Sequence, residues 1–122
     1  MSKVLVVDDL ATELEIICRI LQEAGISVDR ASDGDEAIAR IQESPPDLVV
    51  LDVVMPRMNG FEVVRELREN PKTKHLPVVF CSQKNTEIDK IWGMDMGADA
   101  YITKPFDPQQ LINIVKKLMG NN

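Results

Sequence analysis

The sequence predicts an α/β fold in which a parallel sheet carries helices on both faces. Short aliphatic segments alternate with helical patterns five times along the chain, an order typical of strands joined by right-handed helical crossovers. Two of these segments, Val4–Val7 and Leu48–Leu51, are aliphatic throughout, as strands buried on both faces are. Because 122 residues suffice for one core, we expect a single domain over residues 1–122, a doubly wound sheet of five strands with five helices.

The first half of the chain holds two strand–helix units. The strand over residues 3–7 ends in acid, at Asp8 and Asp9, and the helical pattern after it stops at Gly25. Its apolar positions are Leu14, Ile17, Cys18 and Leu21. Residues 26–31 alternate apolar with polar side chains, as an edge strand does. Asp33–Gly34 then starts a second helix, which Pro45–Pro46 ends. The apolar side chains of that helix are Ala37, Ile38 and Ile41.

The third strand, residues 48–51, runs directly into the carboxylate of Asp52. Pro56 disfavours helix in the residue before it, and Asn59–Gly60 provides a turn and a helix start. The short amphipathic helix that follows ends at Asn70–Pro71 and carries Phe61, Val64 and Leu67. Asp52 therefore lies at the carboxyl end of a core strand, where open α/β sheets place their ligand sites.

The last two units repeat this order. Residues 77–81 form the fourth strand with Ser82 directly after it, and residues 86–96 form a helix of mixed character that ends at Gly97. Residues 100–102 form a short fifth strand, followed by a loop over residues 103–105. The final helix has one apolar face, made of Leu111, Ile114, Val115 and Leu118.

Composition and charge narrow the classes of function. Hydrophobic residues at 44% and charged residues at 28% are ordinary for a soluble globular protein. A formal net charge of −6 and the lack of a basic stripe argue against direct binding to nucleic acid. No apolar run approaches the ~20 residues that span a bilayer, and the chain starts without a signal-peptide pattern. We therefore expect no membrane contact and a cytoplasmic location.

The cysteines and the single histidine do not suggest a metal site. Cys18 and Cys81 lack metal-like spacing, so we interpret both as small buried hydrophobes in a reducing compartment. His75 lies in a loop between lysines, without a second ligand nearby in the sequence, which favours a solvated surface position.

Five polar residues follow four of the strands. Because parallel strands end at the same edge of a sheet, we expect these side chains to converge: Asp8, Asp9, Asp52, Ser82 and Lys104. Three carboxylates in contact would repel one another unless a cation neutralises them, and oxygen-only ligands favour Mg²⁺. A hydroxyl and an ammonium beside such a metal are donors to a phosphoryl group. The pattern therefore predicts a site that carries phosphate.

Each residue of this set also has a purely structural interpretation. Asp8 and Asp9 can cap the first helix, Ser82 can cap the helix that follows it, and Lys104 can pair with a surface acid. Any one of them alone favours that interpretation. Acid, acid, hydroxyl and ammonium at strand ends on one rim, taken together, favour the phosphate site.

Four motifs in the same order resemble the receiver domain of bacterial two-component response regulators, over essentially the whole chain. They are VLVVDD at residues 4–9, LDVVMPRMNGFE at 51–62, VVFCS at 78–82 and GADAYITKPF at 97–106. The resemblance implies a flavodoxin-like fold with strand order 2-1-3-4-5. It also implies a signalling switch and no enzymatic activity beyond self-phosphorylation and self-dephosphorylation.

The resemblance assigns a role to each residue of the set. Asp52 is the phosphoryl acceptor, and Mg²⁺ is held by Asp8, Asp9, Asp52 and the backbone carbonyl of Val54. Lys104 pairs with the phosphoryl oxygens, and Ser82 hydrogen-bonds one of them. Such chemistry requires in-line positioning and charge stabilisation of an aspartate nucleophile.

The resemblance also implies a conformational switch. Tyr101 is the aromatic residue that turns inward when the hydroxyl of Ser82 moves. The Lys104–Pro105 bond is cis in the family, and X–Pro bonds are where a cis peptide is cheap.

Two residues near the site depart from the commoner pattern of the family. Val54 and Lys84 stand two residues after Asp52 and Ser82, where receivers flank the water that hydrolyses the acyl phosphate. Because Val54 cannot orient a water molecule, we expect a longer-lived phosphoryl group. Lys84 can act in either direction, by shielding the phosphoryl group or by attracting a phosphatase.

The resemblance further implies partners. A histidine kinase or phosphotransfer protein would supply the phosphoryl group, and output would pass through protein contact at the face of helix 4, strand 5 and helix 5, where a homodimer can also form. The WGMDMGADAYITKPF stretch most resembles receivers of pilus motility and chemotaxis. Trp92, Met94 and Met96 place apolar surface on this face, although Trp92 can equally be packed in the core.

Three alternatives belong to other classes. A Mg²⁺-dependent phosphohydrolase with an aspartate nucleophile would carry a second acid two residues after that nucleophile, where this chain has Ala11 after Asp9. A nucleotide-binding protein would need a glycine-rich turn after the first strand, which Asp8–Ala11 does not provide. The chain can also be the receiver part of a longer DNA-binding regulator.

Overall fold

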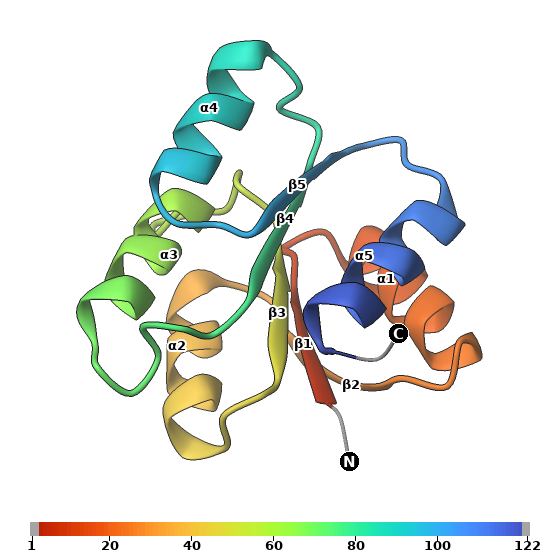
Figure 1. The fold of residues 1–122 in the computed structure, drawn as a ribbon, viewed down its shortest axis with the longest axis horizontal. Helices are drawn as coiled ribbons and strands as arrows, with labels where there is room; N and C mark the ends of the chain where they lie inside the picture. Colours follow the sequence, from red (N-terminus) through yellow and green to blue (C-terminus); the bar gives the residue numbers. More distant parts are fainter. Residues whose placement is uncertain (1–2, 121–122) are drawn as a thin grey trace.

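The structure, a computed structural model, describes residues 3–120 as a five-stranded parallel sheet between two layers of helices (Figure 1). The strands are β1 (Lys3–Val7), β2 (Ser27–Ala31), β3 (Leu48–Leu51), β4 (Val78–Ser82) and β5 (Ala100–Thr103). The helices are α1 (Ala11–Glu23), α2 (Gly34–Glu43), α3 (Gly60–Glu69), α4 (Glu87–Asp95) and α5 (Pro108–Leu118). The first two and last two residues of the predicted 1–122 domain lie outside the described residues.

The strand order β2-β1-β3-β4-β5 confirms the flavodoxin-like topology. All neighbouring strands are parallel, so their carboxyl ends meet at one edge of the sheet. β2 is the edge strand next to β1, and most of its residues are only partly buried, as its alternating sequence predicts. The fourth strand begins and ends one residue later than the sequence indicated, and the fifth ends one residue later, because Ser82 and Thr103 pair in the ladder between them.

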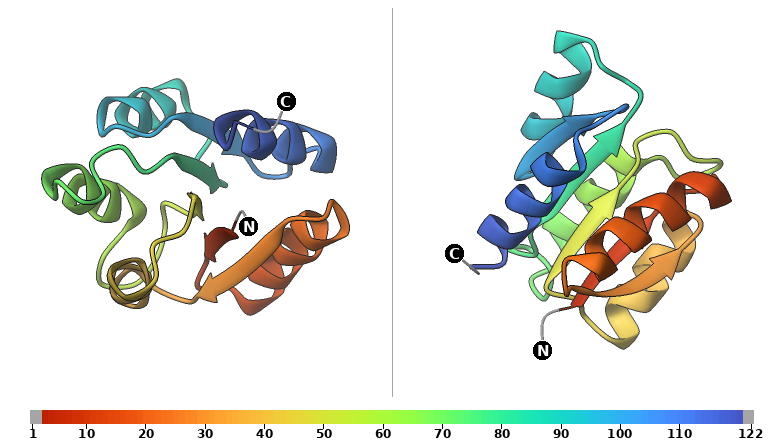
Figure 2. Two further views of the ribbon diagram at one scale, coloured as in Figure 1. Left: turned by 60° about the horizontal axis from the view of Figure 1, so that its bottom comes forward. Right: turned by 90° about the vertical axis from the view of Figure 1, so that its right-hand side faces the viewer.

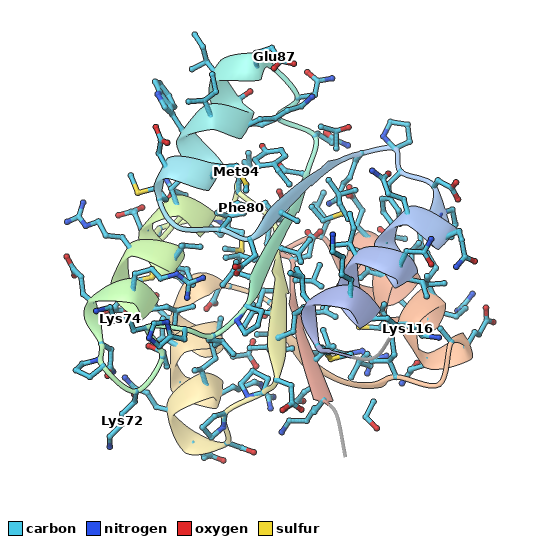
Figure 3. The ribbon with its side chains drawn as sticks, in the orientation of Figure 1. Lys72, Lys74, Phe80, Glu87, Met94 and Lys116 are labelled. Atoms are coloured by element: carbon cyan, nitrogen blue, oxygen red, sulfur yellow. The ribbon has the colours of Figure 1, made fainter. Side chains whose placement is uncertain are left out.

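The two faces of the sheet carry separate halves of the core. The face under α1 and α5 is built from alternate strand residues that pack against Ile17, Cys18, Leu21, Leu111 and Val115. The opposite face packs against α2, α3 and α4, with Phe80 near its centre (Figure 3). Figure 2 shows the same division from two further directions. Both faces of the central strands are therefore buried, which explains their aliphatic sequences.

The cysteines and the histidine lie as the sequence predicts. Cys18 and Cys81 are buried, and burial raises the pKa of the Cys81 thiol to about 12. His75 is exposed in the loop between α3 and β4. Among the described residues, no helix has the length and apolar character to cross a membrane.

The start of α3 fixes the backbone directly after Asp52. Asn59 caps this helix by accepting from the backbone N–H of Glu62, whose side chain accepts from the N–H of Asn59. The N–H of Gly60 donates to the carbonyl of Val53 at 2.8 Å. A Cβ atom on Gly60 would lie 2.3 Å from the carbonyl oxygen of Asp52 and 2.9 Å from the ring of Phe80. Only glycine lets α3 approach the Asp52 strand end this closely.

We predict that Gly60→Ala destabilises the fold by roughly 1–3 kcal/mol, because the added methyl group must displace backbone at the end of β3. Urea denaturation followed by circular dichroism measures this change in the free energy of unfolding. Arg65→Ala is the matched control, since Arg65 is exposed on the same helix. Equal stability of the two variants would contradict the role given to Gly60.

Candidate functional site

The polar residues predicted from the strand ends do converge on one rim of the sheet. Asp8 and Asp9 follow β1, Asp52 follows β3, Ser82 ends β4 and Lys104 follows β5. Asp52 is placed by the hydrogen bond from its N–H to the carbonyl of Val7, and Lys104 by one from its N–H to the carbonyl of Ser82. The rim is therefore assembled by the ladder of the sheet itself.

The three carboxylates form one cluster. An oxygen from each of Asp8, Asp9 and Asp52 lies within 4.8 Å of the others. Asp8 and Asp52 are buried, with exposed fractions of 1% and 7%, whereas Asp9 is exposed. Burial raises the pKa of Asp8, although its hydrogen bond with Lys104 opposes this. Two buried acids and one accessible acid so close together are a donor set for a hard divalent cation.

This cluster fits Mg²⁺ in its chemistry. All of its ligand atoms are carboxylate oxygens, and a small cavity of about 230 Å³ opens beside Asp9, Asp52 and Ser82. Such a cavity leaves room for water and a phosphoryl group next to the acids. Val54 stands at this cavity with 54% of its surface exposed, and its N–H donates to Asp52 Oδ1 at 3.3 Å.

Lys104 is the cation of the site. Its ammonium lies 2.7 Å from Asp8 Oδ2 and 3.3 Å from Asp52 Oδ2, and only 7% of its side chain is exposed. Burial opposes the charged form, but the hydrogen bonds with Asp8 and Glu13 outweigh it, so the pKa of Lys104 is raised. The surface-pair interpretation of Lys104 is therefore wrong. Its bond to Pro105 is a cis peptide.

Glu13 belongs to the site, and sequence reasoning missed it. Its carboxylate makes an ion pair with Lys104 from the first turn of α1, and it lines the same cavity as Asp9 and Asp52. Its direction depends on the residue at which α1 begins, which lies beyond Asp9, so helical spacing from Asp9 does not predict it.

Ser82 and Tyr101 meet at the backbone of Lys84. The Oγ of the buried Ser82 accepts from the N–H of Lys84 at 3.2 Å, and the hydroxyl of Tyr101 donates to the carbonyl of Lys84 at 2.6 Å. Ser82 does not cap α4, because Thr86 does so in a capping box with Asp89. The capping interpretation of Ser82 is therefore wrong.

The capping interpretation of Asp8 and Asp9 is wrong, because the N-cap of α1 is Leu10 and no side chain of the described residues caps this helix. One oxygen of Asp8 accepts from the N–H of Leu10, the residue that precedes α1, at 3.0 Å. The other oxygen accepts from Lys104. Asp8 thus holds the turn between β1 and α1 and joins the charged cluster at the same time.

Helix α4 turns its apolar side chains outward. Trp92 is 57% exposed, so its interpretation as a core residue is wrong. Within α4 only Gly93 is buried, and a Cβ there would lie 2.8 Å from the ring of Tyr101. The exposed apolar residues on and directly after this helix are Ile88, Ile91, Trp92, Met94 and Met96.

A hollow of about 360 Å³ beside the rim connects it with α4. Trp92 lines this hollow together with Val54, Phe61 and Lys84. Val54 also lines the cavity beside Asp52, so it stands between the two spaces.

Comparison with known proteins identifies relatives over almost the whole chain. Residues 4–116 match the family model described as response regulator receiver domain. The chain is 35% identical to protein PilH of Pseudomonas aeruginosa, over 98% of this chain and 99% of that protein. It is 38% identical to the alkaline phosphatase synthesis transcriptional regulatory protein PhoP of Bacillus subtilis, over 97% of this chain but only 48% of that protein.

Solved structures give the same result, and two are 35% identical in sequence to this chain. A putative response regulator from Chloroflexus aurantiacus superposes with a TM-score of 0.94 and covers 98% of both chains. The chemotaxis protein CheY4 of Vibrio cholerae superposes with a TM-score of 0.89 and covers 97% of this chain and 98% of that one. The chain belongs to the response regulator receiver domain family, the signalling modules of two-component systems.

Proposed function

We propose that this chain is a phosphorylation-dependent switch, in which Asp52 accepts a phosphoryl group from a histidine kinase or a phosphotransfer protein. The observation that carries the proposal is the position of Asp52, which lies against two further carboxylates and the ammonium of Lys104 beside an open cavity. This is the arrangement that an aspartate nucleophile requires for phosphoryl transfer.

In the proposed reaction, a carboxylate oxygen of Asp52 attacks the phosphorus of the donor. The new O–P bond forms while the bond from phosphorus to the donor breaks, and its electron pair leaves with the donor. Lys104 is close enough to Asp52 to contact the added oxygens and to balance part of their charge. Asp8, Asp9, Asp52 and the carbonyl of Val54 would hold Mg²⁺, which when bound would neutralise further charge on the phosphoryl group.

The proposed switch runs through the backbone of Lys84. A phosphoryl oxygen on Asp52 would accept a hydrogen bond from the hydroxyl of Ser82. In this structure the oxygen of that hydroxyl accepts from the N–H of Lys84. Movement of Ser82 and of this peptide removes the acceptor that holds the hydroxyl of Tyr101. The ring of Tyr101, which packs against Phe80 and Gly93 in this structure, then changes position, and the face of α4, β5 and α5 changes with it.

Output passes through protein contact at that face, which can bind a target or a second copy of the chain. Similarity to a chemotaxis protein of known structure supports a role in motility or chemotaxis control. The net charge of −6 supports a protein target over nucleic acid for these 122 residues.

Val54 and Lys84 set the lifetime of the phosphoryl group in this proposal. Both line the hollow beside the rim, and the apolar side chain of Val54 offers no hydrogen bond to an attacking water. The charge of Lys84 either shields the phosphoryl group or recruits a phosphatase.

A second candidate is the receiver part of a longer DNA-binding regulator. The transcriptional regulators PhoP and PhoB match this chain over about half of their length, which favours this candidate for output. The proposed chemistry at Asp52 is the same in both cases.

Incubation of the native chain with Mg²⁺ and acetyl phosphate, followed by intact mass, is expected to give one stable phosphoryl adduct. Asp52→Ala should lose it, because the proposal assigns Asp52 as the acceptor and Asp8 and Asp9 as ligands of the metal. Continuous release of phosphate without an adduct would instead support the phosphohydrolase. An adduct that persists in Asp52→Ala would overturn the assignment of Asp52.

We predict that Val54→Asn shortens the lifetime of the phosphoryl group about fivefold, since one hydrogen bond to the attacking water is worth about 1 kcal/mol. The measurement is the decay of the adduct mass after removal of the donor. Val54→Leu is the matched control, with similar size and no amide. Equal lifetimes in all three chains would sink the hypothesis.

The fluorescence of Trp92, the single tryptophan, is expected to report the switch. Titration with beryllium fluoride and Mg²⁺, a phosphoryl mimic, should change its emission, because Trp92 shares a hollow with Val54 and Lys84. The same titration of Asp52→Ala is the control. A silent signal in the native chain would show that α4 takes no part.

A further inference from the structure

Glu13 is the one charged residue in contact with Lys104 that the proposed mechanism does not use. It lies in the first turn of α1, and 24% of its side chain is exposed. Its carboxylate pairs with Lys104 Nζ and faces the same cavity as Asp52. Glu13 is not among the three acids clustered for a metal ion, so its contact in the described part of the site is with the ammonium.

Three carboxylates compete for the ammonium of Lys104. An ammonium has three N–H donors and no acceptor, and Lys104 faces carboxylates of Asp8, Asp52 and Glu13. Its contact with Asp52, at 3.3 Å, is longer than the 2.7 Å contact with Asp8. A phosphoryl group on Asp52 therefore competes with carboxylates that already hold the ammonium.

The charges of the rim also oppose phosphorylation of Asp52. The rim holds four carboxylates and one ammonium, which contacts three of them, and phosphorylation adds further negative charge at Asp52. Glu13 repels that added charge and at the same time draws Lys104 toward α1. The same negative charge lies beside the acidic cluster, where it increases the attraction for a divalent cation.

We propose that Glu13 is a positioning residue that restrains Lys104 on the α1 side of the site, slows phosphorylation of Asp52 and strengthens Mg²⁺ binding. The inference rests on the proposed function, because it assigns a regulator to the same reaction. Glu13 acts through Lys104 and through its charge, without contact with the reacting atoms.

The test compares the native chain with Glu13→Gln, which keeps the length and an acceptor oxygen but removes the charge. Glu15→Gln is the matched control, because Glu15 lies on the same helix and pairs with Arg30 at the surface. The first measurement is the rate of adduct formation from acetyl phosphate at saturating Mg²⁺. The second is the Mg²⁺ dissociation constant of the unphosphorylated chain, from calorimetry without a phosphodonor.

We expect Glu13→Gln to form the adduct about two- to fivefold faster and to bind Mg²⁺ about two- to fivefold more weakly, the range of one partly exposed ion pair. Glu15→Gln should match the native chain in both measurements. A purely structural role for Glu13 would not raise the rate of adduct formation while weakening Mg²⁺ binding.

Two results would overturn the inference about Glu13 while leaving the proposed function intact. One is that the native chain is phosphorylated and Glu13→Gln forms the adduct no faster than it; the other is that the two chains bind Mg²⁺ with equal affinity. A native chain that takes no label under any Mg²⁺ concentration overturns the proposed function as well. Urea denaturation of each variant shows that a change in rate does not come from partial unfolding.

Discussion

The ammonium of Lys104 is the charge on which the rest of the site depends. It contacts Asp8 after β1, Asp52 after β3 and Glu13 on α1, so one cation joins strand ends that are far apart in the sequence. Two of these acids are buried, and a buried carboxylate without a partner carries a large penalty. The ion pairs that compensate for burying these carboxylates in the folded chain also hold a positive charge beside the oxygens of Asp52. Stability of the rim and its chemistry therefore have the same source.

Around this charge, the backbone sets the spacing. Gly60 allows α3 to begin directly against the carbonyl of Asp52, which holds the end of β3 in place. On the other side, the N–H of Lys84 donates to Ser82, and the carbonyl of Lys84 accepts from the hydroxyl of Tyr101. A displacement of Ser82 is thus transmitted to Tyr101 through the backbone of a single residue, Lys84. The proposed switch needs no long network of side chains.

Much of the fold and site could be predicted because both depend on strand ends. Aliphatic runs mark buried parallel strands, and parallel strands bring Asp8, Asp52 and Lys104 to one edge. Glu13 escaped prediction because its direction depends on the residue at which α1 begins, which helical periodicity does not fix. Trp92 was ambiguous because tryptophan is usually buried. Here the adjacent Gly93 faces the sheet, and the ring of Tyr101 from β5 fills the space that a helix side chain would take. Sequence periodicity does not predict this arrangement.

The packing of α4 explains why this helix is suited to change. Its single buried residue is Gly93, so the ring of Tyr101 fills the place where a side chain of the helix would otherwise meet the sheet. That ring lies 5.7 Å from Phe80, between centroids, and its hydroxyl is held only by the carbonyl of Lys84 among the described hydrogen bonds. A helix that buries little apolar surface of its own is held weakly. Any movement of this ring would therefore alter the surface on which α4 rests, and the outward apolar side chains of α4 would move with it.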